Sequence, residues 1–264
     1  MGTGTAGFLH DHFSSVAEGY ARHRPGYPAA LFAWLADLPA RRRLAWDAGT
    51  GSGQAAVGLA EHFERVVAVD PALAQVARAR RHPRVAYRVA AAEASGLPDA
   101  AVDLAVAAQA VHWFDLGAYW REVGRVLAPG GAVAVWTYSS VAVTPAVDAV
   151  VEVYYHRIVG PFWPAERRVV EDGYRDLPFP FAEVEAPEMA MEEGWDLARF
   201  AGYLATWSAS RRWSEAHGGA DPVARVGEDL AAAWCGARRR HAVRWRLGVR
   251  AGRRAMDGPA AASR

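Results

Sequence analysis

Residues 49–53 form a glycine-rich segment, Gly-Thr-Gly-Ser-Gly, between an apolar run that predicts a strand and a pattern that predicts a helix. Glycine permits positive φ angles and lets a ligand approach the backbone closely, so such a turn can bind a nucleotide. Asp47 precedes the first glycine, and Asp70 ends the next predicted strand 23 positions later. A carboxylate at that strand end is placed to accept both hydroxyls of a ribose lying over the glycine loop.

The spacing of the glycines separates two classes of nucleotide-binding loop. A dinucleotide loop reads G-x-G-x-x-G and binds a pyrophosphate at its helix start, whereas this loop reads G-x-G-x-G and continues with Gln54. The acid at Asp47 suits a ligand with a cationic ammonium group better than a diphosphate. A phosphate-binding P-loop needs a lysine, and the chain contains none. A nicotinamide oxidoreductase therefore stays as a disfavoured alternative.

Five motifs follow one another along the chain, each beside a predicted strand: residues 47–53, Asp70, residues 92–93, residues 109–114 and residues 127–131. In this order and spacing the chain resembles the class I S-adenosylmethionine-dependent methyltransferases. Within them it is similar to the small-molecule branch that contains trans-aconitate methyltransferase-like enzymes. The resemblance covers about residues 13–136 and implies S-adenosylmethionine as the cofactor.

The resemblance also implies a role for each cofactor-binding position. Asp70 would bind the ribose, Ala92 and Glu93 would lie at the adenine, and Gln109 would lie beside the methionine portion. Near the N-terminus, a tyrosine and an arginine would bind the methionine carboxylate, since a guanidinium offers paired donors to two oxygens. The residues expected at the cofactor are Tyr20, Arg24, Asp47, Gly49, Gly51, Gly53, Asp70, Ala92, Glu93 and Gln109.

His112 is the candidate catalytic base, because an imidazole titrates near neutral pH and its motif follows the fourth predicted strand. The alternative is that its ring only shapes the pocket or hydrogen-bonds the backbone. Tyr20 is a second catalytic candidate. Large aromatic residues near the strand ends and in the C-terminal third could line an apolar acceptor pocket. The residues expected there are His112, Trp113, Trp136, Tyr138 and Trp207.

Strands that alternate with helices at short intervals predict an α/β fold with a parallel sheet covered on both faces. The resemblance implies a Rossmann-like, seven-stranded, mostly parallel sheet in a single domain over residues 1–264. Residues 13–140 would form the cofactor-binding core, and residues 141–264 the acceptor-side helices and last strands. The tail after Arg250 is expected to fray. The predicted strands are 44–48, 66–69, 85–90, 102–108, 132–138, 184–191 and 242–249, and the predicted helices are 29–38, 54–63, 72–81 (with Pro71 at its first position), 119–127, 145–158, 195–207 and 221–235.

The composition excludes several other classes of protein. Thirty basic residues balance 29 acidic ones, which argues against a general nucleic-acid binder, and the absence of asparagine excludes the Asn-Pro-Pro-aromatic motif of many nucleic-acid methyltransferases. A single cysteine excludes an internal disulfide and a cysteine-based zinc cluster, and no metal site is predicted. No apolar run reaches the roughly 18 residues of a membrane span. We expect a soluble, cytoplasmic protein without membrane or nucleic-acid partners.

The predicted reaction is methyl transfer from S-adenosylmethionine to a small-molecule acceptor. The aromatic C-terminal third favours an aromatic, indole-like acceptor in specialised metabolism. A carboxylate acceptor of the trans-aconitate type is the alternative that the resemblance offers. A non-catalytic S-adenosylmethionine-binding protein is the alternative from another class, because it would need the glycine loop but no acceptor pocket.

Overall fold

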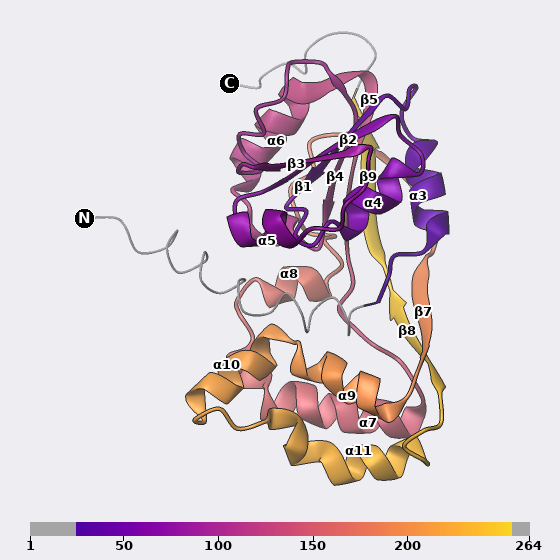
Figure 1. Ribbon diagram of the computed structural model, residues 1–264, viewed down its shortest axis with the longest axis vertical. Coiled ribbons are helices and arrows are strands. Elements are labelled where there is room, and N and C mark those ends of the chain that lie inside the picture. The colour runs from indigo at the N-terminus through magenta and orange to yellow at the C-terminus, as the bar shows by residue number, and fades with distance from the viewer. Residues whose placement is uncertain (1–24, 255–264) are drawn as a thin grey trace, which may run out of the picture.

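The computed structural model describes residues 25–254 of the protein, which form two lobes (Figure 1). The sheet lobe comprises a large β-sheet with helices α3 to α6. The helical lobe comprises α7 and α9 to α11. The strands β7 and β8 run between the two lobes, and α8 lies where the lobes meet (Figure 1).

Across residues 25–254 the large sheet has seven strands in the order β3-β2-β1-β4-β5-β9-β6. The strands β1 to β5 are parallel, and β9 is antiparallel to both of its neighbours. This arrangement confirms the predicted seven-stranded, mostly parallel sheet. The strands are β1 (Leu44–Ala48), β2 (Arg65–Asp70), β3 (Val85–Val89), β4 (Val102–Ala108), β5 (Leu127–Thr137), β6 (Ala182–Val184) and β9 (Gly248–Arg253).

Successive residues of the central strands pack into two different core layers, because side chains alternate across a pleated sheet. On one face, Ala45 and Val66 pack with the helices α3 and α4. On the other face, Trp46 and Val67 pack with α6, which presents Tyr119 and other buried side chains. The apolar strands are therefore covered on both sides, as parallel sheets require. The helices of this lobe are α3 (Ala29–Ala36), α4 (Gln54–Ala60), α5 (Leu73–Arg78), η1 (Val111–Trp113) and α6 (Leu116–Val126).

The core layer beneath α3 and α4 continues into the helical lobe. Trp136 and Tyr138 at the end of β5 lead into a cluster that includes Trp195 and Trp245, whose rings lie 4.8 Å apart. The two lobes thus share one apolar core layer. The elements of this region are α7 (Pro145–Val153), η2 (Tyr154–Ile158), η3 (Gly160–Phe162), α8 (Arg167–Glu171), β7 (Ala190–Trp195), α9 (Leu197–Ala205), α10 (Ser208–Ala216), η4 (Pro222–Val226), α11 (Gly227–Trp234) and β8 (His241–Arg246).

The C-terminal strands differ from the predicted ones in number and in partner. The range 184–191 contains the end of β6 and the start of β7, which belong to different sheets, and the range 242–249 is divided between β8 and β9. The tail does not fray at Arg250, because β9 continues to Arg253 between β5 and β6. Hydrogen bonds on both sides of β9 hold a segment that has little apolar periodicity of its own.

The start of α5 also differs from the prediction. Pro71 is not the first helical residue, because Ala72 is the extended residue that caps the helix. The backbone N–H of Ala72 donates to the Asp70 carboxylate over 2.9 Å, which fixes the turn between β2 and α5. Within residues 25–254, no helix is both long enough and apolar enough to cross a lipid bilayer.

Candidate functional site

The glycine loop connects β1 to α4 through backbone conformations that favour glycine. Gly49, Gly51 and Gly53 have φ angles of +68°, +53° and +78°. A Cβ atom at Gly51 would meet no other atom within 4 Å, so this part of the loop borders open space. The N–H of Thr50 donates to the carbonyl of Val69 over 2.9 Å and ties the loop to β2.

Asp70 lies at the end of β2, beside the glycine loop. One of its carboxylate oxygens accepts the N–H of Gly51 and the other accepts the N–H of Ala72, both at 2.9 Å. These charge-assisted bonds fix the direction of the carboxylate. Because a carboxylate oxygen can accept more than one hydrogen bond, the same group can also bind ribose hydroxyls.

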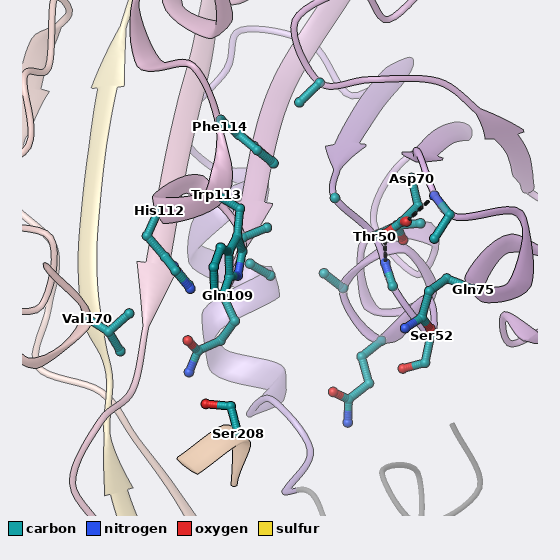
Figure 2. Close-up of a pocket in the computed structure, with 18 of the residues that line it drawn as sticks. Thr50, Ser52, Asp70, Gln75, Gln109, His112, Trp113, Phe114, Val170 and Ser208 are labelled. Atoms are coloured by element: carbon teal, nitrogen blue, oxygen red, sulfur yellow. Dashed lines mark hydrogen bonds between the residues drawn. The ribbon is translucent and has the colours of Figure 1, made fainter. Parts of the chain in front are cut away.

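The loop and Asp70 border a cavity of about 530 Å³ at the carboxyl ends of β1, β2, β4 and β5. That edge of a parallel sheet is where such folds bind ligands, and the volume lies within the roughly 300–1,000 Å³ of ligand pockets. Figure 2 shows Thr50, Ser52, Asp70 and Gln75 on one side of the cavity and Gln109, His112, Trp113 and Ser208 on the other. The predicted site residues that line the cavity are Gly49, Gly51, Asp70, Ala92, Glu93, Gln109, His112, Trp113, Tyr138 and Trp207.

Asp47 was expected at the cofactor, but it does not line the cavity. Its side chain is fully buried beneath the loop, where it accepts the hydroxyl of Thr50 over 2.6 Å. Burial raises the pKa of Asp47 to about 7. The hydrogen bond from Thr50 lowers this pKa, but by less than burial raises it. Asp47 therefore shapes the loop from below rather than facing a ligand.

Gly53, expected at the cofactor, and Trp136, expected in the acceptor pocket, do not line the cavity either. A Cβ atom at Gly53 would collide with the hydroxyl of Tyr87, so this glycine makes room for a protein side chain. Trp136 is completely buried in β5 and packs edge-to-face on Tyr27, with ring centroids 5.5 Å apart. Tyr27 lines the cavity in its place.

Tyr20 and Arg24, expected at the methionine carboxylate, lie outside the described residues. The described chain begins beside the site. The carbonyl of Pro25 accepts the Gln54 side chain over 3.1 Å, at the start of α4, and the N–H of Gly26 donates to Glu193 over 2.9 Å.

Gln109 follows β4 and has a φ angle of +55°, which is uncommon for a side chain of this type. Both ends of its amide are bound by the chain. Its Nε2 donates to the carbonyl of Tyr138, and its Oε1 accepts the hydroxyl of Thr137, both over 2.8 Å. Strain of this kind is concentrated at functional sites, and here the surrounding bonds maintain it.

His112 lies in η1 and lines the cavity. Its Nδ1 lies 2.6 Å from the hydroxyl of Tyr174, a residue that sequence reasoning did not single out. Burial lowers the pKa of His112 to about 4, and the positive charge of Arg167 acts in the same direction. The imidazole is therefore neutral near pH 7, which is the form that can accept a proton.

The far end of the cavity is lined from the helical lobe and from α8. Trp163, Tyr203 and Trp207 form an aromatic wall, in which Trp207 lies 5.6 Å from Trp163 and 5.7 Å from Tyr203. Two arginines, Arg167 and Arg211, line the same end, and the guanidinium of Arg167 stacks 4.4 Å from the Trp163 ring. No sequence signal distinguishes these arginines, because they are two among thirty basic residues.

Two sequence comparisons relate the chain to known proteins. A family profile described as a methyltransferase domain matches residues 46–135. A protein of Dictyostelium discoideum named as a methyltransferase is 32% identical over 228 residues, which cover 85% of this chain and 86% of that protein. The chain belongs to the class I S-adenosylmethionine-dependent methyltransferases.

Further relatives of this methyltransferase agree with the assignment. A solved structure from Anaeromyxobacter dehalogenans, described as a type II methyltransferase, is 53% identical with a TM-score of 0.83 and covers 87% of this chain and 97% of that chain. A yeast protein of Saccharomyces cerevisiae named as an S-adenosylmethionine-dependent methyltransferase is 26% identical over 140 residues, which are 50% of this chain and 47% of that protein. The trans-aconitate-like assignment within the family stays a prediction.

The residues of this methyltransferase fit S-adenosylmethionine as its cofactor. The open space above Gly51 admits a ligand directly onto the loop, and the fixed carboxylate of Asp70 suits two ribose hydroxyls. Glu93 lines the cavity while its carboxylate accepts the N–H of Asp115 over 2.9 Å, so its direction is fixed as well. Within residues 25–254, no cluster of three or more His, Cys, Asp or Glu side chains is arranged to hold a metal ion.

Proposed function

We propose that this methyltransferase acts on an aromatic or heteroaromatic small molecule, as an enzyme of specialised metabolism. The observation that supports the proposal is the aromatic wall of Trp163, Tyr203 and Trp207 in the lining of the cavity. Flat rings offer large apolar contact area to a flat ligand, and they attract cationic groups such as a sulfonium. Location in the cytoplasm and the absence of nucleic-acid and membrane partners remain predictions.

In this proposal each part of the chain has a defined task. Asp70, Gly49 and Gly51 hold the cofactor, and the aromatic wall orients the acceptor. The acceptor atom is thereby aligned with the methyl carbon and the sulfur before the reaction. When bound, S-adenosylmethionine supplies an electrophilic methyl group with a neutral thioether as the leaving group. His112 accepts the proton of an acceptor N–H or O–H at Nε2, the nitrogen that does not contact Tyr174.

A carboxylate acceptor is a second candidate, and a separate observation favours it. Arg167 and Arg211 place two guanidinium groups at the acceptor end of the cavity. Guanidinium donors suit carboxylate oxygens, and a carboxylate needs no base because it is ionised at neutral pH. The proximity of Arg167 to His112 also opposes the formation of an imidazolium in the absence of an anionic ligand.

An acceptor panel with methyl-labelled S-adenosylmethionine distinguishes the two candidates. The panel contains aromatic N–H and O–H compounds, aromatic carboxylic acids, their primary amides, and aliphatic carboxylic acids. Labelling of aromatic N–H or O–H compounds that is lost in His112→Gln supports the first proposal. Labelling confined to carboxylic acids, with ester products and no dependence on His112, would replace it with the second.

A further inference from the structure

Arg167 is the first residue of α8, which lies where the two lobes meet (Figure 1). Its side chain is only 17% exposed, although it carries a permanent positive charge and lines the cavity. A largely buried charge costs free energy unless it binds partners. The partners of this guanidinium therefore indicate what it is placed to do.

The chain holds the guanidinium of Arg167 at two of its three nitrogens. Nε donates to the hydroxyl of Tyr155 over 2.7 Å, and Nη2 donates to the carbonyl of Ser139 over 3.0 Å. The guanidinium carbon also lies 4.4 Å from the centroid of the Trp163 ring. These contacts come from η2, from the turn after β5 and from the turn before α8, so they fix the direction of the group.

The acidic neighbour Glu171 does not occupy the remaining nitrogen. Its carboxylate is 3.5 Å from Nε and accepts the hydroxyl of Tyr155, which bridges the two charged groups. A guanidinium has five N–H groups, of which the bonds to Tyr155 and Ser139 use one on Nε and one on Nη2. Among residues 25–254, no group accepts a hydrogen bond from Nη1 of Arg167. Nη1 and the second N–H of Nη2 are thus left for a ligand.

We propose that Arg167 binds a carboxylate of the acceptor that is not itself methylated. The acceptor is then an aromatic acid. Its ring contacts Trp163 and Trp207, whose ring centroids lie 5.6 Å apart, and its carboxylate binds Nη1 and Nη2 in the paired geometry that suits a guanidinium. This proposal rests on the proposed function, because it takes the methylated atom to be a ring nitrogen or oxygen.

The charges during the reaction separate an anchoring role of Arg167 from binding of the reacting group. Methyl transfer to a carboxylate oxygen cancels the negative charge that the guanidinium binds. Arg167 would stabilise such an acceptor more before the reaction than in the transition state, which lowers the rate of the chemical step. A carboxylate elsewhere on the acceptor keeps its charge throughout, so its ion pair orients the ring without slowing the step.

The anchored carboxylate takes no part in the bond changes. The ring nitrogen or oxygen forms a bond to the methyl carbon while the carbon–sulfur bond breaks and its electron pair stays on sulfur. The acceptor proton passes to Nε2 of His112. Arg167 and His112 line the same cavity, and the charge of Arg167 acts on the imidazole, so both groups are within reach of one small acceptor.

Binding of matched acids and amides tests the anchor without turnover. We suggest calorimetry near pH 7 on full-length protein loaded with S-adenosylhomocysteine. The probes are indole-2-carboxylate, indole-3-acetate, 3-hydroxybenzoate and 4-hydroxybenzoate, each compared with its uncharged primary amide. At least one acid should bind at least about tenfold more tightly than its amide. Acids that bind no more tightly than their amides, or that do not bind, would overturn the proposal.

Variants identify the arginine responsible for the preference. Arg167→Met keeps an apolar stem beside Trp163 and should abolish the preference for the acid, while the affinities for the amide and for S-adenosylhomocysteine change little. Arg167→Lys keeps the charge but not the paired donors and should retain a reduced preference. Arg168→Met is the matched control, because this exposed neighbour on α8 does not line the cavity. A preference that persists in Arg167→Met, or that Arg168→Met abolishes equally, would contradict the proposal.

Tyr155 is a positioning residue in this proposal, since its hydroxyl holds Nε and bridges the guanidinium to Glu171. Tyr155→Phe should let Glu171 pair directly with Arg167 and lower the preference for the acid several-fold, with amide affinity unchanged. An unchanged preference would remove Tyr155 from the proposal, and equal losses of acid and amide affinity would show a merely structural role.

The position of the transferred methyl group separates this proposal from the proposed function. Label on a ring nitrogen or oxygen of the preferred acid supports both. Label on ring atoms of acids and amides alike, with no dependence on Arg167, would leave the proposed function in place and overturn the anchor. Alkali-labile ester products that depend on Arg167 would show that it binds the reacting group and would overturn both.

Discussion

At the end of the cavity that we propose for the cofactor, the lining groups come from one stretch of strand ends and turns. The glycine loop and Asp70 lie within 22 residues of one another and are joined by backbone hydrogen bonds. At the end proposed for the acceptor, by contrast, the lining side chains come from α8, α9, α10 and the turns around them, over residues 163–211. One end is built by backbone geometry and the other by side chains of separate helices.

This difference has a functional consequence. Backbone turns at strand ends depend on the sheet, so the cofactor end is fixed by the same contacts that make the fold. The acceptor end depends on side chains that can change without altering the strands. We therefore expect substitutions at the two ends to affect different binding constants.

The largest effect is expected where the two ends meet. His112→Gln should lower kcat by about 10²–10⁴-fold, because general-base catalysis typically contributes a rate factor of that size. Cofactor affinity should stay nearly unchanged. The neutral imidazole is the active form and the pKa of His112 is lowered to about 4, so wild-type kcat should fall only as the pH drops toward 4. The sequence alone predicted this limb near the ordinary histidine pKa.

Steady-state kinetics over pH 4–8 check this prediction, with cofactor binding measured by calorimetry. An acidic limb near pH 6.5 would show that the bound acceptor restores an ordinary histidine pKa. Near-normal kcat in His112→Gln would remove the base from the mechanism.

Asp47→Asn should change the pH dependence of folding stability in the sheet lobe. Burial raises the folded-state pKa from 3.8 to about 7, so ionising Asp47 costs free energy in the folded state. The stability gained from the protonated form is full below pH 3.8 and is lost as the pH rises through about 7. A rise in the pKa from 3.8 to about 7 corresponds to about 4 kcal/mol of folding free energy at most.

Urea unfolding of the wild type and Asp47→Asn at pH 4 and pH 8 isolates the contribution of Asp47 ionisation to folding stability. The unfolding free energy of Asp47→Asn minus that of the wild type should be larger at pH 8 than at pH 4. A constant difference between the two proteins would mean that Asp47 is ionised at both pH values.

Asp70→Ala tests the cofactor end. The loss of charge-assisted hydrogen bonds should weaken cofactor binding by about 1.5–3 kcal/mol, or about 10–150-fold in Kd, with little change in the KM of the acceptor. Asp99→Ala is the matched control, because its exposed carboxylate pairs with Arg125 outside the cavity. Equal cofactor affinity in both variants by calorimetry would refute the assignment of Asp70.

Arg211→Met tests the acceptor end and should have the smallest effect. If an acidic group of the acceptor binds there, its KM should rise about tenfold, while neutral acceptors and the cofactor are unaffected. Arg212→Met is the control, since this neighbour on α10 does not line the cavity. A change in cofactor affinity instead would show that Arg211 acts on the cofactor and would contradict the assignment of separate ends to cofactor and acceptor.

The core of the sheet lobe could be predicted from sequence because its signals are short-range. The strands β1, β2, β3 and β4 match the predicted ranges within a residue or two, as does the glycine loop between β1 and α4. The C-terminal strands could not be predicted, since β9 depends on a partner in β5 that lies far away in sequence, and β6 in turn depends on β9.

The sequence by itself determined the strands β1 to β4, the glycine loop and the carboxylate at the end of β2, because turn geometry and strand alternation act between near neighbours. Only the tertiary structure decided which side chains line the cavity. It directed Asp47 and Trp136 into the core, selected Arg167 and Arg211 from thirty basic residues, and placed Tyr174 behind a histidine 62 positions away. The physical reason is that side-chain direction and long-range packing are set by the whole fold, whereas backbone turns are set by the residues within them.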